Sequence, residues 1–261
     1  AAMTGRDLAE MAPETAPSPD TPPLLTVEGL GLAGVFEDVS LSVKRGEVLG
    51  IAGLLGSGQT DIAEALFGLQ PADKGRITLD GQAVRIDGVA DALRHGIGYV
   101  PGDRLSQGLF LEQSISDNLL VGSVAQATSR TGLLDRRKVR ELDAESIRSL
   151  SIKTPSAAEP VSSLSGGNQQ RVVIARWLAR SPRLLILNSP TVGVDVGSKA
   201  GILDILRGRA KEGMAVVIIS DDPTVLVAIC QRVLFVRHGR LAGELVPPDI
   251  TVESITKELA A

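Results

Sequence analysis

Apolar and polar residues alternate along two stretches near the start of the chain, and this spacing predicts strands. The stretches are 24-LLTVEGL-30 and 38-DVSLSVKRGEVLGIAG-53, and the second ends in an apolar run over residues 48–52. Such a run suits a strand that is buried on both faces. The segment 75-GRITLDGQAVRI-86 predicts two more strands, joined by a tight hairpin at Asp80-Gly81.

Helical spacing begins directly after the first buried strand. In 61-DIAEALFGL-69, Ile62, Ala65, Leu66 and Leu69 fall on one helical face, so we expect this face to pack on the sheet. Residues 104–163 are more polar and also helix-like, which predicts a helical insert between two β-rich segments. Within it, charges of alternating sign in 135-DRRKVRELDAE-145 are typical of a solvated helix.

A second series of strands and helices follows the insert. Helices are predicted over 168–179 and 198–212, strands over 183–188 and 214–220, and a closing hairpin over 233–245. Buried strands separated by helices indicate a mainly parallel sheet. The expected fold class is therefore α/β, with an antiparallel β part and the inserted helices.

Composition and charge narrow the classes of function. The 261 residues carry 27 basic and 31 acidic side chains, a formal charge of −4, which argues against wrapping nucleic acid. The single cysteine, Cys230, excludes an internal disulfide and fits a reducing cytoplasm. No apolar run is long enough to span a bilayer. His95 and His238 have no second ligand at zinc spacing, so both are expected in surface or turn positions.

Three apolar residues are expected to belong to the core. They are Phe36 in a strand pattern, Trp177 four residues after Val173 on a helix, and Cys230 in a helix-like apolar run.

Two glycine-rich segments carry the candidate chemistry. The first, 53-GLLGSGQT-60, lies between the buried strand and the first helix, where a phosphate-binding loop of the form G-x-x-x-x-G-K-[ST] belongs. Gly53, Gly58 and Thr60 fit this template, but position 59 is Gln. The second is 164-LSGGNQQ-170 at a helix start, with Ser165 as the expected N-cap.

The string LSGGNQQ resembles the signature motif of ABC-type ATPases, in the form shared by carbohydrate importers. The segment 184-LLILNSPTVGVDVGSK-199 looks like that family's Walker B strand and D-loop. The segments 216-VVIISDDPTVL-226 and 98-GYVPGDR-104 take the places of its switch strand and Q-loop. Five motifs in order, across most of residues 24–245, imply a P-loop NTPase-like ABC ATPase fold that binds ATP with Mg²⁺.

The resemblance is closest to the second half of tandem importers of ribose, galactose, xylose and similar sugars. In those chains an M-x-G-R segment ends the first half, and here 3-MTGR-6 precedes a Pro-rich arm. The expected layout is an arm over 1–23, an ABC domain over 24–245 with its helical subdomain at about 104–175, and a short C-terminal segment over 246–261. Nucleoside importers share this layout and are the closest alternative.

The implied partners are another ABC half, a membrane permease and, indirectly, a periplasmic binding protein, but no nucleic acid. The implied place is the cytoplasmic face of the cell membrane.

The resemblance also assigns site residues. Positions implied to contact nucleotide are Gly53, Gly56, Ser57, Gly58, Gln59, Thr60 and Asn188. Thr60 is the implied, weak Mg²⁺ ligand. Signature and D-loop positions are Ser165, Gly166, Gly167, Asn168, Gln169 and Asp195. In ABC dimers each ATP is held between one domain's phosphate loop and the opposite domain's signature.

Five positions depart from the family pattern. Gln59 replaces the loop Lys, Asn188 the Walker B Asp, Ser189 the catalytic Glu, Ser220 the switch His, and Gly102 the Q-loop Gln or Glu. No aromatic residue is well placed to stack on adenine. We therefore expect a half that binds nucleotide weakly, hydrolyses little or no ATP and donates its signature to a partner's site.

Three alternatives stay open at this stage. The chain can be an independently active ATPase that uses unconventional residues, or a structural module that binds no nucleotide. A soluble ABC protein of translation or repair is disfavoured, because the chain lacks a basic face.

Overall fold

The computed structural model describes residues 16–18, 20–129 and 131–260. Most of the expected arm, including 3-MTGR-6, lies outside these residues. The described residues divide into two compact units. The helical unit comprises 100–182 and 190–205, and the sheet unit comprises the described residues up to 99 together with 183–189 and 206–260. Each unit is described by itself.

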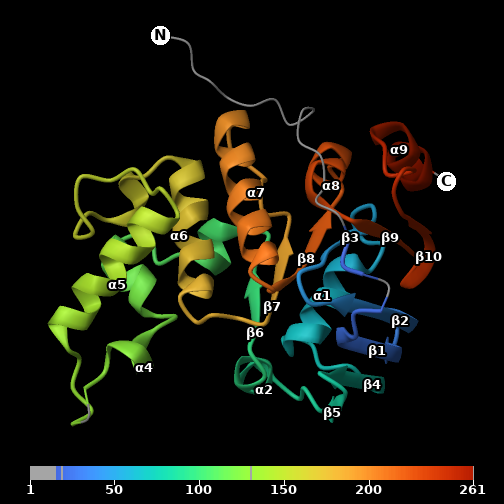
Figure 1. The fold of residues 1–261 in the computed structure, drawn as a ribbon, viewed down its shortest axis with the longest axis horizontal. Coiled ribbons are helices and arrows are strands. Elements are labelled where there is room, and N and C mark those ends of the chain that lie inside the picture. The colour runs from blue at the N-terminus through green and yellow to red at the C-terminus, as the bar shows by residue number, and fades with distance from the viewer. Residues whose placement is uncertain (1–15, 19, 130, 261) are drawn as a thin grey trace. The chain divides into compact units, whose positions relative to one another are not determined.

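A six-stranded sheet forms the centre of the sheet unit, with strand order β10-β9-β3-β8-β7-β6 (Figure 1). β3 runs parallel to both β8 and β9, and β7 runs parallel to β8, whereas β10 is antiparallel to β9. Its strands are β3 (Val48–Ala52), β6 (Ile97–Val100), β7 (Leu184–Asn188), β8 (Ala215–Ser220), β9 (Arg232–Arg237) and β10 (Arg240–Leu245). All residues of β3 and β8 are buried, as their continuous apolar runs predict.

A second sheet of four antiparallel strands has the order β2-β1-β4-β5. Its strands are β1 (Pro23–Leu32), β2 (Phe36–Lys44), β4 (Lys74–Leu79) and β5 (Gln82–Val84). The predicted hairpin at Asp80-Gly81 is confirmed: both residues have positive φ, 48° and 74°, which a two-residue turn between β4 and β5 requires. A mainly parallel sheet with an antiparallel β part is therefore present, as the sequence predicts.

Helix α1 (Gln59–Phe67) begins directly after the glycine loop. Ile62, Ala65 and Leu66 are buried, as predicted, but the expectation for Leu69 is wrong. The helix ends because Gly68 takes φ 78°, and Leu69 lies past this end with 49% of its surface exposed. The other helices of this unit are α2 (Val89–Arg94), α8 (Pro223–Ile229) and α9 (Val252–Ala260).

The helical unit contains the insert predicted from the polar middle of the sequence (Figure 1). Its helices are α3 (Ile115–Leu120), α4 (Val124–Ala127), α5 (Arg136–Ser149), α6 (Gly166–Leu178) and the first ten residues of α7 (Val196–Lys211). α5 is largely exposed and carries the i,i+4 ion pair Arg137–Glu141, so the solvated helix is confirmed.

The core expectations are met for two of the three residues. Phe36 is 2% exposed and Cys230 is fully buried, where burial raises the pKa of its thiol. Trp177 is only partly buried on α6, so its assignment to the core is wrong. Among the described residues, no helix combines the length and apolar character needed to cross a membrane.

Candidate functional site

The glycine loop adopts a backbone that depends on glycine at two positions. Gly56 has φ 81° and Gly58 has φ 102°, values that L side chains rarely adopt. A Cβ at Gly58 would also lie 3.0 Å from the Cα of Gly239. Gly58 precedes α1 without any side-chain cap, so the first N–H groups of this nine-residue helix point out of its N-terminus. Such a terminus favours an anion.

The Gln59 side chain turns back into this loop instead of reaching out of it. Its Nε2 donates to the carbonyl oxygen of Gly53 at 3.1 Å, and its Oε1 accepts from the Ser57 hydroxyl. Gln59 is 8% exposed, and a Cβ at Gly53 would collide with Ser57 Oγ. The loop is therefore closed on itself by neutral side chains and supplies no positive charge for a phosphate.

The end of β7 places Asn188 next to α1. Asn188 Nδ2 donates to Thr60 Oγ1 at 3.4 Å, and Ser189 Oγ donates to Asn188 Oδ1 at 3.4 Å. Tyr99 also forms a hydrogen bond with Asn188, and its ring stacks on Phe67 with centroids 5.2 Å apart. Burial raises the pKa of Tyr99 to about 12, so the phenol stays neutral here. Thr60, Ser189 and Tyr99, the hydrogen-bond partners of Asn188 named here, are all uncharged.

Ser220 ends the neighbouring strand β8 and is also buried, at 4% exposed. Its Oγ accepts from the backbone N–H of Asp222 at 3.0 Å. The end of β7 is joined to β8 by a backbone hydrogen bond, in which the N–H of Ser189 donates to Ile219 O at 2.8 Å. The carboxyl ends of β3, β7 and β8 thus bring the loop, Asn188, Ser189 and Ser220 to one edge of the sheet, where parallel sheets bind ligands.

The residues at this edge fit a phosphate group better than a magnesium ion. Glycine backbone and an uncapped helix N-terminus suit phosphate oxygens. Mg²⁺ prefers carboxylates, but Thr60, Asn188 and Ser189 offer only neutral oxygens, and the Asn188 amide directs its N–H groups at Thr60. No group of three His, Cys, Asp or Glu residues suited to a metal occurs in the described part of the chain.

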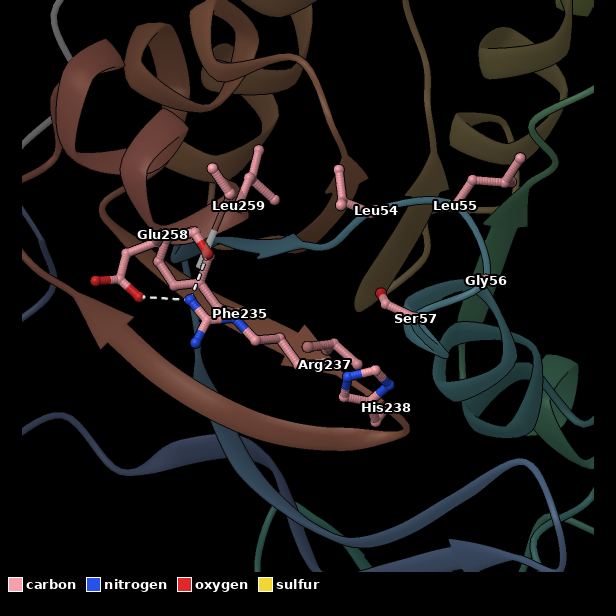
Figure 2. A pocket seen from close by; sticks show the side chains of 11 residues that line it. Leu54, Leu55, Gly56, Ser57, Phe235, Arg237, His238, Glu258 and Leu259 are labelled. Atoms are coloured by element: carbon pink, nitrogen blue, oxygen red, sulfur yellow. Dashed lines mark hydrogen bonds and ion pairs between the residues drawn. The ribbon is translucent and has the colours of Figure 1, made fainter.

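A cavity of about 310 Å³ adjoins the loop (Figure 2). Leu54 and Leu55 border it from the loop, Phe235 and His238 from the end of β9, and Leu259 from α9. His238 lies in the β9–β10 turn with φ 49°, which agrees with its expected turn position. His95 is likewise the residue that ends α2.

The signature segment lies in the helical unit, at the start of α6. Ser165 occupies the N-cap position, as predicted, but its side chain makes no capping hydrogen bond. Instead its Oγ accepts from Asn168 Nδ2 at 3.0 Å, while Asn168 Oδ1 accepts from the N–H of Lys153 at 2.9 Å. Gln169 is 8% exposed, and its Nε2 donates to Val161 O. Ser165 is thus exposed, whereas Gln169 faces inward.

Asp195 directly precedes helix α7 in the same unit. Its carboxylate accepts from the N–H of Ser198 at 2.9 Å. Hydrogen bonds from Ser198, and then the charge of Arg171, hold the pKa of Asp195 below its usual range. A Cβ at Gly167 would collide with the Ser198 hydroxyl, so the start of α7 packs directly against the start of α6. This packing requires glycine at 167.

The predicted site residues therefore form two groups, one in each unit. Gly53 to Thr60, Asn188, Ser189 and Ser220 gather in the sheet unit, and the signature, Asp195 and Gly102 belong to the helical unit. Gly102 lies in a bend after β6 and offers no side chain.

Sequence reasoning missed two residues. Tyr99 contacts Asn188, and Arg104 donates to Val192 O and Gly193 O. Both belong to 98-GYVPGDR-104, and the only sequence signal for a functional role was their closeness to the predicted Q-loop position, Gly102.

Known proteins resemble the chain in sequence along nearly its whole length. The family profile described as ABC transporter matches residues 36–192. The chain is 39% identical over 253 residues to the ribose import ATP-binding protein RbsA 1 of Rubrobacter xylanophilus, covering 97% of this chain and 50% of that protein. It is 41% identical over 253 residues to the ribose import ATP-binding protein RbsA of Yersinia pestis, with 97% and 50% covered. The chain spans about half the length of these curated relatives.

Solved structures show the same fold. A nucleotide-free ATP-binding cassette from an ABC transporter superposes with a TM-score of 0.77 at 21% identity, covering 92% of this chain and 96% of that one. CbiO1 from Clostridium perfringens, part of the ABC transporter complex cbiONQ, gives 0.72 at 26% identity, with 90% and 92% covered. The fold is that of a P-loop NTPase-like ABC cassette.

Proposed function

This chain belongs to the ABC transporter family as an ATP-binding cassette, and from that membership we propose that it serves an importer of a monosaccharide or similar small polar solute. In this proposal it hydrolyses little ATP itself and donates its signature to the ATP of a partner cassette. Residues 24–245 form the cassette, with its helical subdomain at about 104–175. The two relatives named above are ribose import ATP-binding proteins, which supports the solute class.

One contrast carries the proposal. At the phosphate loop the Gln59 side chain is turned back onto Gly53, and the β7 end supplies the neutral Asn188 and Ser189. Loss of a charge-assisted hydrogen bond costs about 1.5–3 kcal/mol, and loss of a general base costs about 10²–10⁴-fold in rate. At the signature, Ser165 stays exposed beside a helix start packed on the D-loop. In this proposal the phosphate-loop half-site lacks the charged side chains that the family uses, whereas the signature half-site keeps the family's residues.

The partners follow from this division of labour. The partner cassette supplies the hydrolysing phosphate loop, in the same polypeptide if this chain is the second half of a tandem importer. The two cassettes lie at the cytoplasmic face of a membrane permease, and their closure around ATP drives the permease between conformations. A periplasmic binding protein delivers the solute. The half-length match to the curated relatives supports the tandem arrangement.

Two alternatives predict different results. If the chain is an independently active ATPase, the purified chain turns over ATP despite its neutral residues. If it belongs to a nucleoside importer, the cassette chemistry is the same and only the solute changes.

Titration of Mg-ATP into the purified chain, with phosphate release followed on the same sample, tests the proposal. We expect weak binding without release. Release that disappears in Ser165→Ala would replace the proposal with the active-ATPase alternative. Absence of binding would confine the chain's role to its signature.

A further inference from the structure

We propose that Arg104 is a positioning residue that fixes the D-loop to the start of the signature helix α6, so that the signature is already formed when a partner's nucleotide arrives. Here the D-loop means residues 191–195. This inference rests on the proposed signature donation, because it assigns the side chain that keeps the donating surface in shape.

Arg104 reaches the D-loop with both terminal nitrogens. Nη1 donates to Val192 O at 2.8 Å, and Nη2 donates to Gly193 O at 3.2 Å. The partners lie 88 and 89 residues further along the chain, so this contact is tertiary. A guanidinium presents its donors as a rigid planar fork, which holds two successive carbonyls at once. A lysine ammonium can act on them only as a point donor.

The same guanidinium fills the space between the D-loop and the signature. A Cβ at Gly166 would lie 2.8 Å from Arg104 Nη2 and 2.8 Å from Gly193 O. A Cβ at Gly193 would lie 3.1 Å from Arg104 Nη1, and Gly193 itself has φ 66°. Both glycines are therefore needed for the three segments to meet. Arg104 Nε is buried without a hydrogen-bond partner, and the hydrogen bonds to the two D-loop carbonyls orient the head group.

Arg104 belongs to a short turn that packs against the signature helix α6. It begins the π-helical turn Arg104–Gly108, whose start is capped by Asp103 through the N–H groups of Leu105 and Ser106. At the other end, Gly108 O accepts from Arg176 on α6. A Cβ at Gly108 would come within 3.3 Å of Val173, also on α6. The turn is thus anchored on α6 and extends Arg104 to the D-loop.

The position of this turn explains why the contact matters. Gly102, two residues earlier, stands where the resemblance places the Q-loop Gln or Glu, and it has no side chain. In the same segment, 98–104, Arg104 forms hydrogen bonds to the D-loop. The turn, the D-loop and the signature consequently move as one body, and a displacement of any of them is transmitted to the other two.

Hydrogen–deuterium exchange on the purified chain tests the contact without any partner. In Arg104→Ala we expect the amides of Ser198 and Lys199, which donate to Asp195, to exchange about tenfold faster or more. Arg104→Lys should lie between Arg104→Ala and the parent chain. The control Arg140→Ala removes an exposed arginine of α5 and should leave these amides unchanged. Equal exchange in Arg104→Ala and the parent would overturn the inference.

Turnover by the two-cassette protein separates this inference from the proposed function. We expect Arg104→Ala to lower kcat about tenfold or more with KM for ATP within about twofold, because the partner's own loop still binds ATP. A general loss of folding would instead lower turnover in proportion to the amount of folded protein that is lost. In that case Arg104→Lys would not restore kcat.

The variant Ser165→Arg, in the same protein, tests signature donation itself. If Ser165→Arg abolishes turnover and Arg104→Ala does not lower it, the inference fails and the proposed function stands. If Ser165→Arg leaves turnover intact, the proposed function fails, and the exchange experiment alone decides whether Arg104 holds the D-loop.

Discussion

The amide nitrogen of Gln59 lies 3.1 Å from the carbonyl oxygen of Gly53, so the side chain at the position where the sequence predicts the family's phosphate-binding lysine bonds to its own loop. The loop therefore offers a phosphate backbone N–H groups but no positively charged side chain of its own. Affinity for ATP and its dependence on charge follow from this contact.

Replacing Gln59 with lysine should strengthen ATP binding by the purified chain. A charge-assisted hydrogen bond is worth about 1.5–3 kcal/mol, which corresponds to roughly 10- to 100-fold in affinity. Calorimetric titration of ATP into Gln59→Lys measures the change. The control Gln59→Met has similar length and no charge, and equal affinities for Lys and Met would contradict this explanation.

Restoring the whole hydrolytic set should create a second active site. We expect Gln59→Lys, Asn188→Asp and Ser189→Glu together to raise phosphate release in a two-cassette protein whose partner site is inactivated. The matched control omits Ser189→Glu, and it should bind ATP but turn over about 10²–10⁴-fold more slowly. Confirmed ATP binding without any gain in turnover would count against this explanation of the departures.

The ion pair between the partly buried Arg232 and the buried Glu47 should contribute strongly to stability. Arg232 Nε lies 2.9 Å from Glu47 Oε1, and Glu47 is only 4% exposed. Arg232→Ala leaves this carboxylate buried without its cation, which costs about 3–5 kcal/mol.

Urea denaturation of Arg232→Ala and a control measures the difference. The control Arg137→Ala breaks the exposed pair with Glu141 and should cost at most about 0.5 kcal/mol. Similar unfolding free energies for the two variants would show that the buried pair is not important.

Asp143 on α5 should make the free energy of unfolding fall as pH rises. Burial is the main cause that raises the pKa of Asp143, against the opposing hydrogen bond from Ser116, and its Oδ1 has no partner. Between the ordinary pKa of 3.8 and the higher folded value, the folded state binds more protons than the unfolded state. Stability contributed by this group is complete below 3.8 and is lost as pH rises through the folded pKa.

The variant Asp143→Asn should remove that part of the pH dependence. It keeps a hydrogen-bonding group for Ser116 and should raise the unfolding free energy at neutral pH by about 1 kcal/mol. Denaturation curves across acidic to neutral pH provide the measurement. Glu112→Gln, at an exposed position, is the control and should leave the curve unchanged. A parent and an Asp143→Asn variant with the same pH profile would refute the prediction.

Local features of the sequence predicted much of the fold. The buried strand, the glycine loop and helix α1 follow from residues that are neighbours in sequence, as does the turn at Asp80-Gly81. Helical periodicity places Leu69 on the buried face, but the helix ends before it because Gly68 takes a positive φ.

Contacts between distant segments were beyond sequence reasoning. Nothing in the spacing indicates that Arg104 meets Val192 and Gly193, which follow it by 88 and 89 residues. Ser165 was expected to cap the helix, but its hydroxyl accepts a hydrogen bond from Asn168. Side-chain direction at such positions depends on the tertiary surroundings, which one sequence does not display.

The most direct test of the account is ATP turnover by a two-cassette protein in which this chain carries Ser165→Arg. A long cationic side chain at this exposed position would occupy the space that signature donation requires for the partner's nucleotide. We predict that turnover falls about 100-fold or more, while the control Ser162→Arg, three residues earlier and also exposed, retains it. Full turnover by Ser165→Arg would contradict the claim that this cassette acts through its signature.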